Sequence, residues 1–221
     1  MRKLKKRIEF KIAVDGSSAS GKTTGSKLIA KKLNMKFLSS GALYRYCAFK
    51  ILENKNKYNV KFINKVANSI TLKKLQNKEL YSPEVAKLSS IIAKKPYVRK
   101  ALKNFQKNFI KKSKLVIVEG RDIGSKIMPN ADLKLFFTCS SKEKAKRRLK
   151  EFKSQNKRIT LKQVEKALIQ RDKDDTRRKI SPLIMTKNAV LVDTTKLTIK
   201  QMEAKLTNLV KNSLKIKYGN L

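Results

Sequence analysis

The chain has 221 residues, of which 40% are hydrophobic and 33% are charged, so it is long enough to bury a core of domain size and is not wholly disordered. It contains no histidine, which excludes histidine bases, histidine metal ligands and every Ser-His or Cys-His nucleophile pair. Its two cysteines, Cys47 and Cys139, lie far apart in the sequence, which excludes a disulfide framework and a zinc ribbon, and we expect both in the core. Any chemistry must therefore come from lysine, arginine, carboxylates, hydroxyls, backbone amides or a bound ion.

The formal net charge of +40 has two interpretations. It is typical of a polyanion-binding surface, or it reflects a chain biased toward lysine and asparagine throughout. Lysines are scattered from Lys3 to Lys217 and aromatic residues are not interleaved with them as in a stacking platform, which favours the bias. The eleven arginines are the better guide to a specific site, because guanidinium groups bind phosphate with two parallel hydrogen bonds.

The N-terminal segment is basic but leads into only a short apolar run before Asp15. A signal peptide needs an uncharged core of roughly 7–15 residues, and a membrane span needs about 18 or more. We therefore expect a soluble protein of a reducing compartment, the cytoplasm.

Short apolar runs alternate along the chain with longer segments of helical periodicity. Strands are predicted at residues 8–14, 36–38, 115–119, 133–138 and 189–192. Helices are predicted at residues 22–33, 42–55, 96–112, 141–155, 161–174 and 199–211. Strands separated by helices predict the α/β class, with a parallel sheet covered by helices on both faces. The lysine-rich stretch 60–95 is interpreted as a mostly helical insertion.

The first predicted strand leads directly into a sequence that fits G-x-x-x-x-G-K-[ST], namely Gly16, Ser17, Ser18, Ala19, Ser20, Gly21, Lys22 and Thr23, followed by Thr24. The two glycines permit the backbone angles that aim successive amides at one phosphate, and the following helix directs its positive end at the same anion. Lys22 reaches the β and γ phosphates, and the Thr23 hydroxyl can ligate Mg²⁺. This phosphate loop (P-loop) predicts binding of a nucleoside triphosphate.

Four further motifs follow in order, and the base-reading N-K-x-D of GTPases is absent. Ser39-Ser40-Gly41-Ala42-Leu43-Tyr44-Arg45 stands after the second strand, and Glu119-Gly120-Arg121-Asp122 ends the third. The segment from Arg171 to Arg178 and then Ser181-Pro182-Leu183 come later. Over residues 12 to about 206 these motifs resemble the bacterial cytidylate kinases. Adenylate kinases carry T-G-D at the second motif, where this chain has Ser-Gly-Ala.

The resemblance implies a P-loop kinase made of one domain, residues 1–221, with a five-stranded parallel sheet flanked by helices. It implies a monophosphate-binding insertion at about 60–95 and a lid at about 153–178. The implied reaction transfers the γ-phosphoryl group of ATP to CMP or dCMP with Mg²⁺. The implied partners are these small molecules, with no specific nucleic acid, no membrane and a monomeric state. A kinase for UMP or AMP and a basic RNA-binding protein are the alternatives.

The resemblance also implies roles for individual residues. Residues that match the family's CMP-binding positions are Ser40, Tyr44, Arg45, Ser90, Arg99, Gly120, Arg121, Asp122, Arg171, Asp175 and Arg178. The catalytic positions among the matched residues are Lys22, Arg121, Asp122 and Arg171. Arg148 stands where the family's lid helix supplies a further arginine. Six of the eleven arginines thus fall on positions that face phosphate, more than a general basic bias would place there.

The chain departs from the family's pattern at several positions. Ser17 replaces a proline of the loop, Ser39 replaces an aspartate, and Ala19 replaces a glycine whose backbone conformation it must adopt. The insertion is short, and residues 70–82 lack a hairpin that family members carry.

Several acidic residues have two interpretations each. Glu119 orients a Mg²⁺-bound water or forms a structural salt bridge, and Asp15 orients Lys22 or the metal shell or serves the structure alone. The cluster Asp172, Asp174 and Asp175 could be a solvated helix face. Asp175, spaced one helical turn from Arg171, is also our candidate to accept a hydrogen bond from the cytosine amino group.

Overall fold

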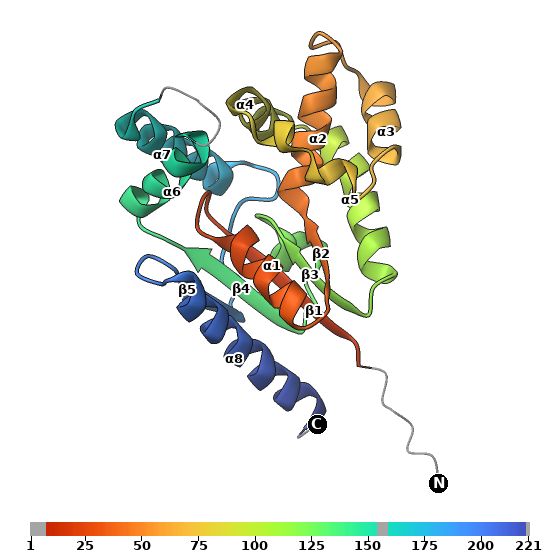
Figure 1. Ribbon diagram of the computed structural model, residues 1–221. Helices are drawn as coiled ribbons and strands as arrows, with labels where there is room; N and C mark the ends of the chain where they lie inside the picture. The colour runs from red at the N-terminus through yellow and green to blue at the C-terminus, as the bar shows by residue number, and fades with distance from the viewer. Residues whose placement is uncertain (1–7, 154–158, 220–221) are drawn as a thin grey trace.

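The computed structural model describes residues 8–153 and 159–219. Its centre is one sheet of five parallel strands in the order β2-β3-β1-β4-β5 (Figure 1). The strands are β1 (Phe10–Gly16), β2 (Lys36–Ser39), β3 (Leu115–Glu119), β4 (Leu133–Thr138) and β5 (Ala189–Asp193). All five lie within one or two residues of the strands expected from the sequence, and the predicted α/β class with a five-stranded parallel sheet is confirmed.

Helices cover both faces of the sheet (Figure 1). They are α1 (Lys22–Lys32), α2 (Ser40–Glu53), α3 (Val60–Asn68), α4 (Pro83–Ile92), α5 (Pro96–Lys111), α6 (Ser141–Lys153), α7 (Leu161–Arg177) and α8 (Ile199–Tyr218). Of the described residues, none belongs to a helix long and apolar enough to cross a membrane.

The alternation of side chains along β1 divides the core in two. Phe10, Ile12 and Val14 point to the face covered by α1 and α8, where they pack with buried residues of β4. Ala13 points to the opposite face, where α2 and α5 pack against β3. Because every strand is parallel, the carboxyl ends of the strands share one edge of the sheet, and the loops that follow them meet there.

Two helical regions rise above this edge (Figure 1). The first spans the expected insertion and contains α3, two short 3₁₀ turns (Lys74–Gln76 and Lys78–Tyr81) and α4. The described residues 70–82 hold these turns and no strand, in accord with the expected loss of a hairpin. The second region is the α6–α7 pair, which packs around its own small cluster of Ala145, Val164 and Leu168. Within the expected lid, residues 154–158 lie outside the described part.

Some predicted helix boundaries are wrong, and two of the differences have a local cause. Helix α2 begins at Ser40 rather than at residue 42, because the Ser39 hydroxyl accepts a hydrogen bond from the Ala42 amide and caps the helix. Helix α8 continues to Tyr218 rather than to residue 211, because the Tyr218 ring packs on the core and its hydroxyl donates to the Glu9 carbonyl at 2.6 Å. Helix α7 likewise runs past residue 174 to Arg177.

Candidate active site

The P-loop connects β1 to α1 and has the backbone conformation that the sequence predicts. Gly16 has φ +146°, and a Cβ added there would lie 2.1 Å from the Phe137 carbonyl oxygen of β4. Gly21 has φ +84° directly before α1. Ala19 has φ +56°, so the alanine does adopt a left-handed conformation that favours glycine.

Lys22 is buried under this loop, with 5% of its surface exposed. Its ammonium donates to the Ser17 carbonyl oxygen, which folds the side chain back across the loop. Burial, together with the nearby charge of Arg121, lowers the pKa of Lys22 to about 7. Burial therefore destabilises the charged form of Lys22 in the free protein, and an anion bound in the loop would stabilise that charge.

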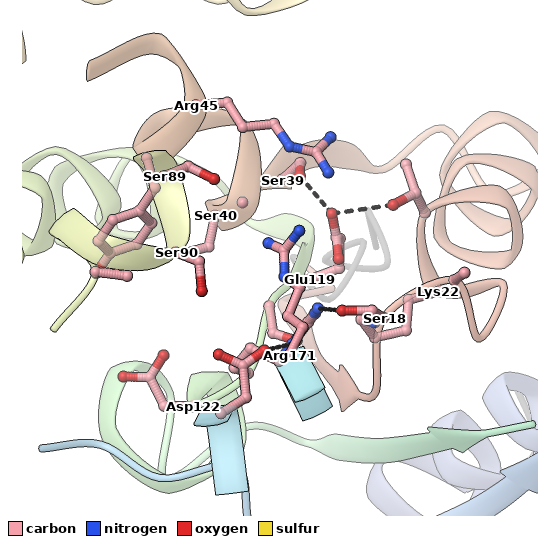
Figure 2. A pocket seen from close by; sticks show the side chains of 18 of the residues that line it. Ser18, Lys22, Ser39, Ser40, Arg45, Ser89, Ser90, Glu119, Asp122 and Arg171 are labelled. Atoms are coloured by element: carbon pink, nitrogen blue, oxygen red, sulfur yellow. Dashed lines mark hydrogen bonds and ion pairs between the residues drawn. The ribbon is translucent and has the colours of Figure 1, made fainter. Parts of the chain in front are cut away.

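A pocket opens between the P-loop and the two helical regions. Figure 2 shows Ser18 and Lys22 on one side of it and Ser89 and Ser90 of α4 on the other. All eleven residues expected at CMP-binding positions line this pocket: Ser40, Tyr44, Arg45, Ser90, Arg99, Gly120, Arg121, Asp122, Arg171, Asp175 and Arg178. Arg148 of α6 lines it as well, as do Ser18, Ala19, Lys22 and Thr23 of the P-loop. The structure therefore brings together residues that lie as far apart in the sequence as the P-loop and α7.

The pocket is strongly positive, because seven cations and three carboxylates line it. The carboxylates are already engaged by protein groups. Asp122 pairs with Arg99, whose guanidinium also donates to the Ala93 carbonyl at 3.1 Å. Asp175 pairs with Arg121 at 2.8 Å and with Arg178 at 3.4 Å.

Two of the arginines have no such partner. No described carboxylate forms an ion pair with Arg45 or Arg171, and the buried Nε of Arg171 has no hydrogen-bond partner among the described residues. Burial and the neighbouring charges of Arg121 and Arg45 lower the pKa of Arg171 to about 9. Burial and Arg148 lower the pKa of Arg45. Figure 2 shows both side chains directed into the space beside Glu119. Unpaired and mutually repelling guanidinium groups of this kind are suited to a polyanionic ligand.

A second cavity lies on the outer side of the P-loop, between α6 and the segment that follows β5. It is lined by Ala19, Ser20, Gly21, Lys22, Thr23, Thr24, Lys27 and, on the far side, Arg147, Thr194 and Met202. It shares six residues with the first pocket, so the two cavities meet there: Ala19, Lys22, Thr23, Arg45, Tyr81 and Arg148. Of the P-loop residues expected to bind ATP, Gly16 and Ser17 line neither cavity.

Glu119 ends β3 beside the P-loop, and its carboxylate accepts hydrogen bonds from two hydroxyls. The Thr23 hydroxyl donates to Oε1 at 3.2 Å, and the Ser39 hydroxyl donates to the same oxygen. Of the two interpretations of Glu119, this geometry favours the metal-directed one, because the carboxylate faces the hydroxyl expected to ligate Mg²⁺. Ser39, which stands where the family has aspartate, thus donates a hydrogen bond to the Glu119 carboxylate.

Of the two interpretations of Asp15, the geometry favours the structural one. Its two oxygens accept hydrogen bonds from the Ile123 amide at 2.8 Å and the Gly124 amide at 2.7 Å. Burial outweighs these hydrogen bonds and raises its pKa to about 6. Asp15 therefore shapes the loop that carries Arg121 and Asp122.

Two of the three acids in the cluster on α7, Asp172 and Asp175, face the protein, whereas Asp174 is partly exposed to solvent. Asp172 accepts from the Ser18 amide at 2.9 Å and from the Lys144 ammonium at 2.6 Å, which ties α7 to the P-loop and to α6. Asp174 pairs with Lys94, next to α4. Both oxygens of Asp175 face arginines, which favours a role in holding those arginines over the expected contact with cytosine.

Sequence reasoning missed several residues of the site. Asp172 has no signal in the sequence beyond its charge, and nothing in its spacing links it to Ser18, 154 positions away. Tyr81 stands at the meeting point of both cavities, in a 3₁₀ turn that has no motif of its own. Arg147 donates to the hydroxyl and the carbonyl oxygen of Thr194 and thereby supports the second cavity, whereas the resemblance points only to its neighbour Arg148.

Solved structures share the fold of this chain. A gluconokinase from Sinorhizobium meliloti 1021 is similar with a TM-score of 0.50 and 15% identity, covering 98% of this chain and 100% of that one. An uncharacterized protein from Eubacterium ventriosum ATCC 27560 is similar with a TM-score of 0.51 and 13% identity, covering 93% and 98% of the two chains. At these identities the likeness supports the fold alone.

Sequence comparisons are more specific. A cytidylate kinase from Alkaliphilus oremlandii is 37% identical over 216 residues, which cover 92% of this chain and 99% of that relative. One from Mycoplasmoides gallisepticum is 36% identical over 220 residues, which cover 94% and 96% of the two chains. The family model described as cytidylate kinase matches residues 12–212. With the P-loop, the arginine-lined pocket and these matches in agreement, the chain belongs to the cytidylate kinase family.

Proposed function

We propose that this protein transfers the γ-phosphoryl group of ATP to CMP or dCMP, giving ADP and CDP or dCDP. The observation that carries the proposal is the meeting of two cavities at Lys22, Arg45 and Arg148, one cavity formed on the P-loop and the other lined by arginines. A donor triphosphate on the loop and an acceptor monophosphate among the arginines would bring their reacting phosphates to this junction. Membership of the family supports CMP as the acceptor.

The reaction needs no protein base. The attacking atom is a phosphate oxygen of CMP, which is already largely ionised near neutral pH because the second pKa of a phosphate monoester is about 6. It forms a bond to the γ-phosphorus of ATP while the bond from that phosphorus to the β-γ bridging oxygen breaks and ADP leaves. Catalysis then depends on alignment and on offsetting negative charge, which suits a chain without histidine.

The cations divide between these two tasks. Arg45, Arg99 and Arg121 hold the acceptor phosphate, and the ion pairs of Arg99 with Asp122 and of Arg121 with Asp175 fix two of the three guanidinium groups. Lys22 and Arg171 offset the charge of the transferring group. Their lowered pKa values describe the protein without an anion, and a bound triphosphate would raise both.

The donor set next to the P-loop fits Mg²⁺. The ion prefers one or two protein oxygens together with substrate phosphates, and the described residues contain no cluster of three acids or cysteines that would indicate a site made by protein alone. Thr23 and Glu119 are the residues that would hold it, since the hydroxyl of the one donates to the carboxylate of the other. When bound with ATP, Mg²⁺ supplies charge neutralisation at the phosphates.

A panel of acceptors tests the proposal. ADP formation from ATP and Mg²⁺ should be fast with CMP or dCMP, and slow with UMP, with AMP and with no acceptor. If UMP or AMP is the preferred acceptor, the base assignment is wrong. If ATP is hydrolysed equally fast with and without CMP, the assignment of a phosphate acceptor is wrong. The same preparation, run on a sizing column, tests our expectation of a monomer.

A further inference from the structure

Arg45 contacts an aromatic ring at the junction of the two cavities. Its guanidinium carbon lies 4.6 Å from the centroid of the Tyr81 ring, within the roughly 6 Å at which a cation is attracted to an aromatic face. Arg45 comes from α2, and Tyr81 ends the 3₁₀ turn Lys78–Tyr81 in the insertion. Both side chains line both cavities.

This contact is the one specific interaction of the Arg45 guanidinium within residues 8–153 and 159–219. There, no hydrogen bond or ion pair of its five N–H groups is found, whereas Arg99 and Arg121 are each fixed by a carboxylate. A long side chain without such a partner loses several rotamers when it binds a ligand, at a cost in free energy. A ring stacked on the flat face of the guanidinium restricts those rotamers and leaves its N–H edge available for phosphate.

The Tyr81 ring is itself firmly placed. Leu80, the residue before it, is fully buried in the core on the α2 side of the sheet. Ser82, the residue after it, caps α4 through a hydrogen bond from the Val85 amide to its hydroxyl at 3.2 Å, and Pro83 begins that helix. The backbone on both sides of the tyrosine is therefore held, and the ring packs against the same core.

We propose that Tyr81 is a positioning residue that holds the Arg45 guanidinium, through its ring face, in the orientation that binds the acceptor phosphate. The inference rests on the proposed function for the identity of that acceptor. In this role the ring of Tyr81 links the insertion to the junction of the two cavities. The phenol hydroxyl of Tyr81 does not contribute.

Steady-state kinetics of a double-mutant cycle test this role. Tyr81→Leu should raise the KM for CMP by about three- to thirty-fold, the range expected for a partly desolvated cation–aromatic contact, and change the KM for ATP less. In an Arg45→Met background the same substitution should change the KM for CMP by less than about twofold, because the guanidinium is gone. Tyr81→Phe keeps the ring and should stay within about twofold of wild type. Tyr97→Leu, a partly buried tyrosine on α5 outside both cavities, is the matched control.

Equal effects of Tyr81→Leu in the two backgrounds would overturn the proposal, because the ring would then act independently of Arg45. A loss in Tyr81→Phe as large as in Tyr81→Leu would overturn it as well, because the hydroxyl would be the active group.

A spectroscopic arm keeps the test independent of turnover and of the folding of the leucine variant. The chain has no tryptophan, so Tyr81→Trp introduces a single indole that retains an aromatic face. Its emission should shift when Arg45→Met is added, with no nucleotide present, and should respond to CMP while Arg45 is intact. Emission that is indifferent to Arg45 contradicts the contact. If wild type fails to phosphorylate CMP while this emission still depends on Arg45, the proposed function fails and the positioning of Arg45 stands.

Discussion

Removing the P-loop lysine should make the free protein more stable while it abolishes activity. Lys22 is buried and its pKa is lowered from 10.5 to about 7, which corresponds to a cost of roughly 4 kcal/mol for holding its charge in the folded protein at pH 7. Lys22→Met removes that cost and fills similar space. It also removes the hydrogen bonds from the ammonium to the Ser17 carbonyl and the Ser20 hydroxyl, which offsets about 1–2 kcal/mol. The net gain is about 2–3 kcal/mol, or about 4–12 °C in Tm for a chain of this length.

The pH dependence of this stability gain tests whether the buried charge of Lys22 causes it. Because the folded-state pKa of Lys22 is lowered, the cost is complete at and below about pH 7 and disappears as the pH rises toward 10.5. The difference in the free energy of unfolding between Lys22→Met and wild type should therefore be largest near pH 6.5 and shrink by pH 9.5. Urea unfolding at both values, without nucleotide, measures it.

The control is Lys31→Met, an exposed lysine on the same helix, which should change the stability little at either pH. With ATP and CMP present, Lys22→Met should lose turnover by at least about a hundredfold, because the transferring phosphoryl group loses its closest cation. A methionine variant that is less stable than wild type at pH 6.5, or a stability difference that is the same at both pH values, would refute the reasoning.

Three further predictions concern single residues. Gly16→Ala should destabilise the protein by about 3 kcal/mol or more in urea unfolding, because the added Cβ would collide with the Phe137 carbonyl. The control Gly41→Ala should not, because the nearest atom to its Cβ would lie at 3.7 Å, and similar unfolding midpoints for the two variants would contradict this. Asp175→Asn should lower kcat/KM for CMP and for UMP by a similar factor of about 10–100, because both its oxygens hold arginines; a loss confined to CMP would restore the base-reading role. Glu119→Gln should raise the Mg²⁺ concentration needed for half-maximal rate by about tenfold and leave the KM for CMP within twofold, and an unchanged Mg²⁺ requirement would remove Glu119 from the metal site.

The sheet and the P-loop could be predicted from the residues themselves because their signals are local, whereas the set of pocket residues rests on the resemblance to a family. Short apolar runs between periodic helical segments fix the parallel sheet, and a parallel sheet places the loops after its strands at one edge. The P-loop, the motif before Arg45 and the motif at Arg121 each follow a strand, so their meeting follows from the topology. Helix α7 adds Arg171 and Asp175 through contacts that only the resemblance to a family could supply.

The pairing of charges could not be predicted, because it depends on contacts between distant segments. The sequence alone does not distinguish Arg99, which is held by Asp122, from Arg45, which has an aromatic ring in place of an acid. Asp15 directly precedes the P-loop and could face its ligand, yet its two oxygens accept hydrogen bonds from backbone amides more than a hundred positions away. Asp175 has the spacing of a base-reading acid, but the two guanidinium groups that face it decide what its carboxylate can bind.

The central claim is that the γ-phosphoryl group of ATP passes directly to the phosphate of CMP at the junction of the two cavities. The most direct measurement follows the label from γ-³²P ATP after a single turnover with CMP and Mg²⁺. The account predicts that the label appears in the β-phosphate of CDP in step with ADP formation, and that Lys22→Ala, with its P-loop cation removed, forms neither product at a comparable rate. Label released as inorganic phosphate, with CMP recovered unchanged, would contradict it.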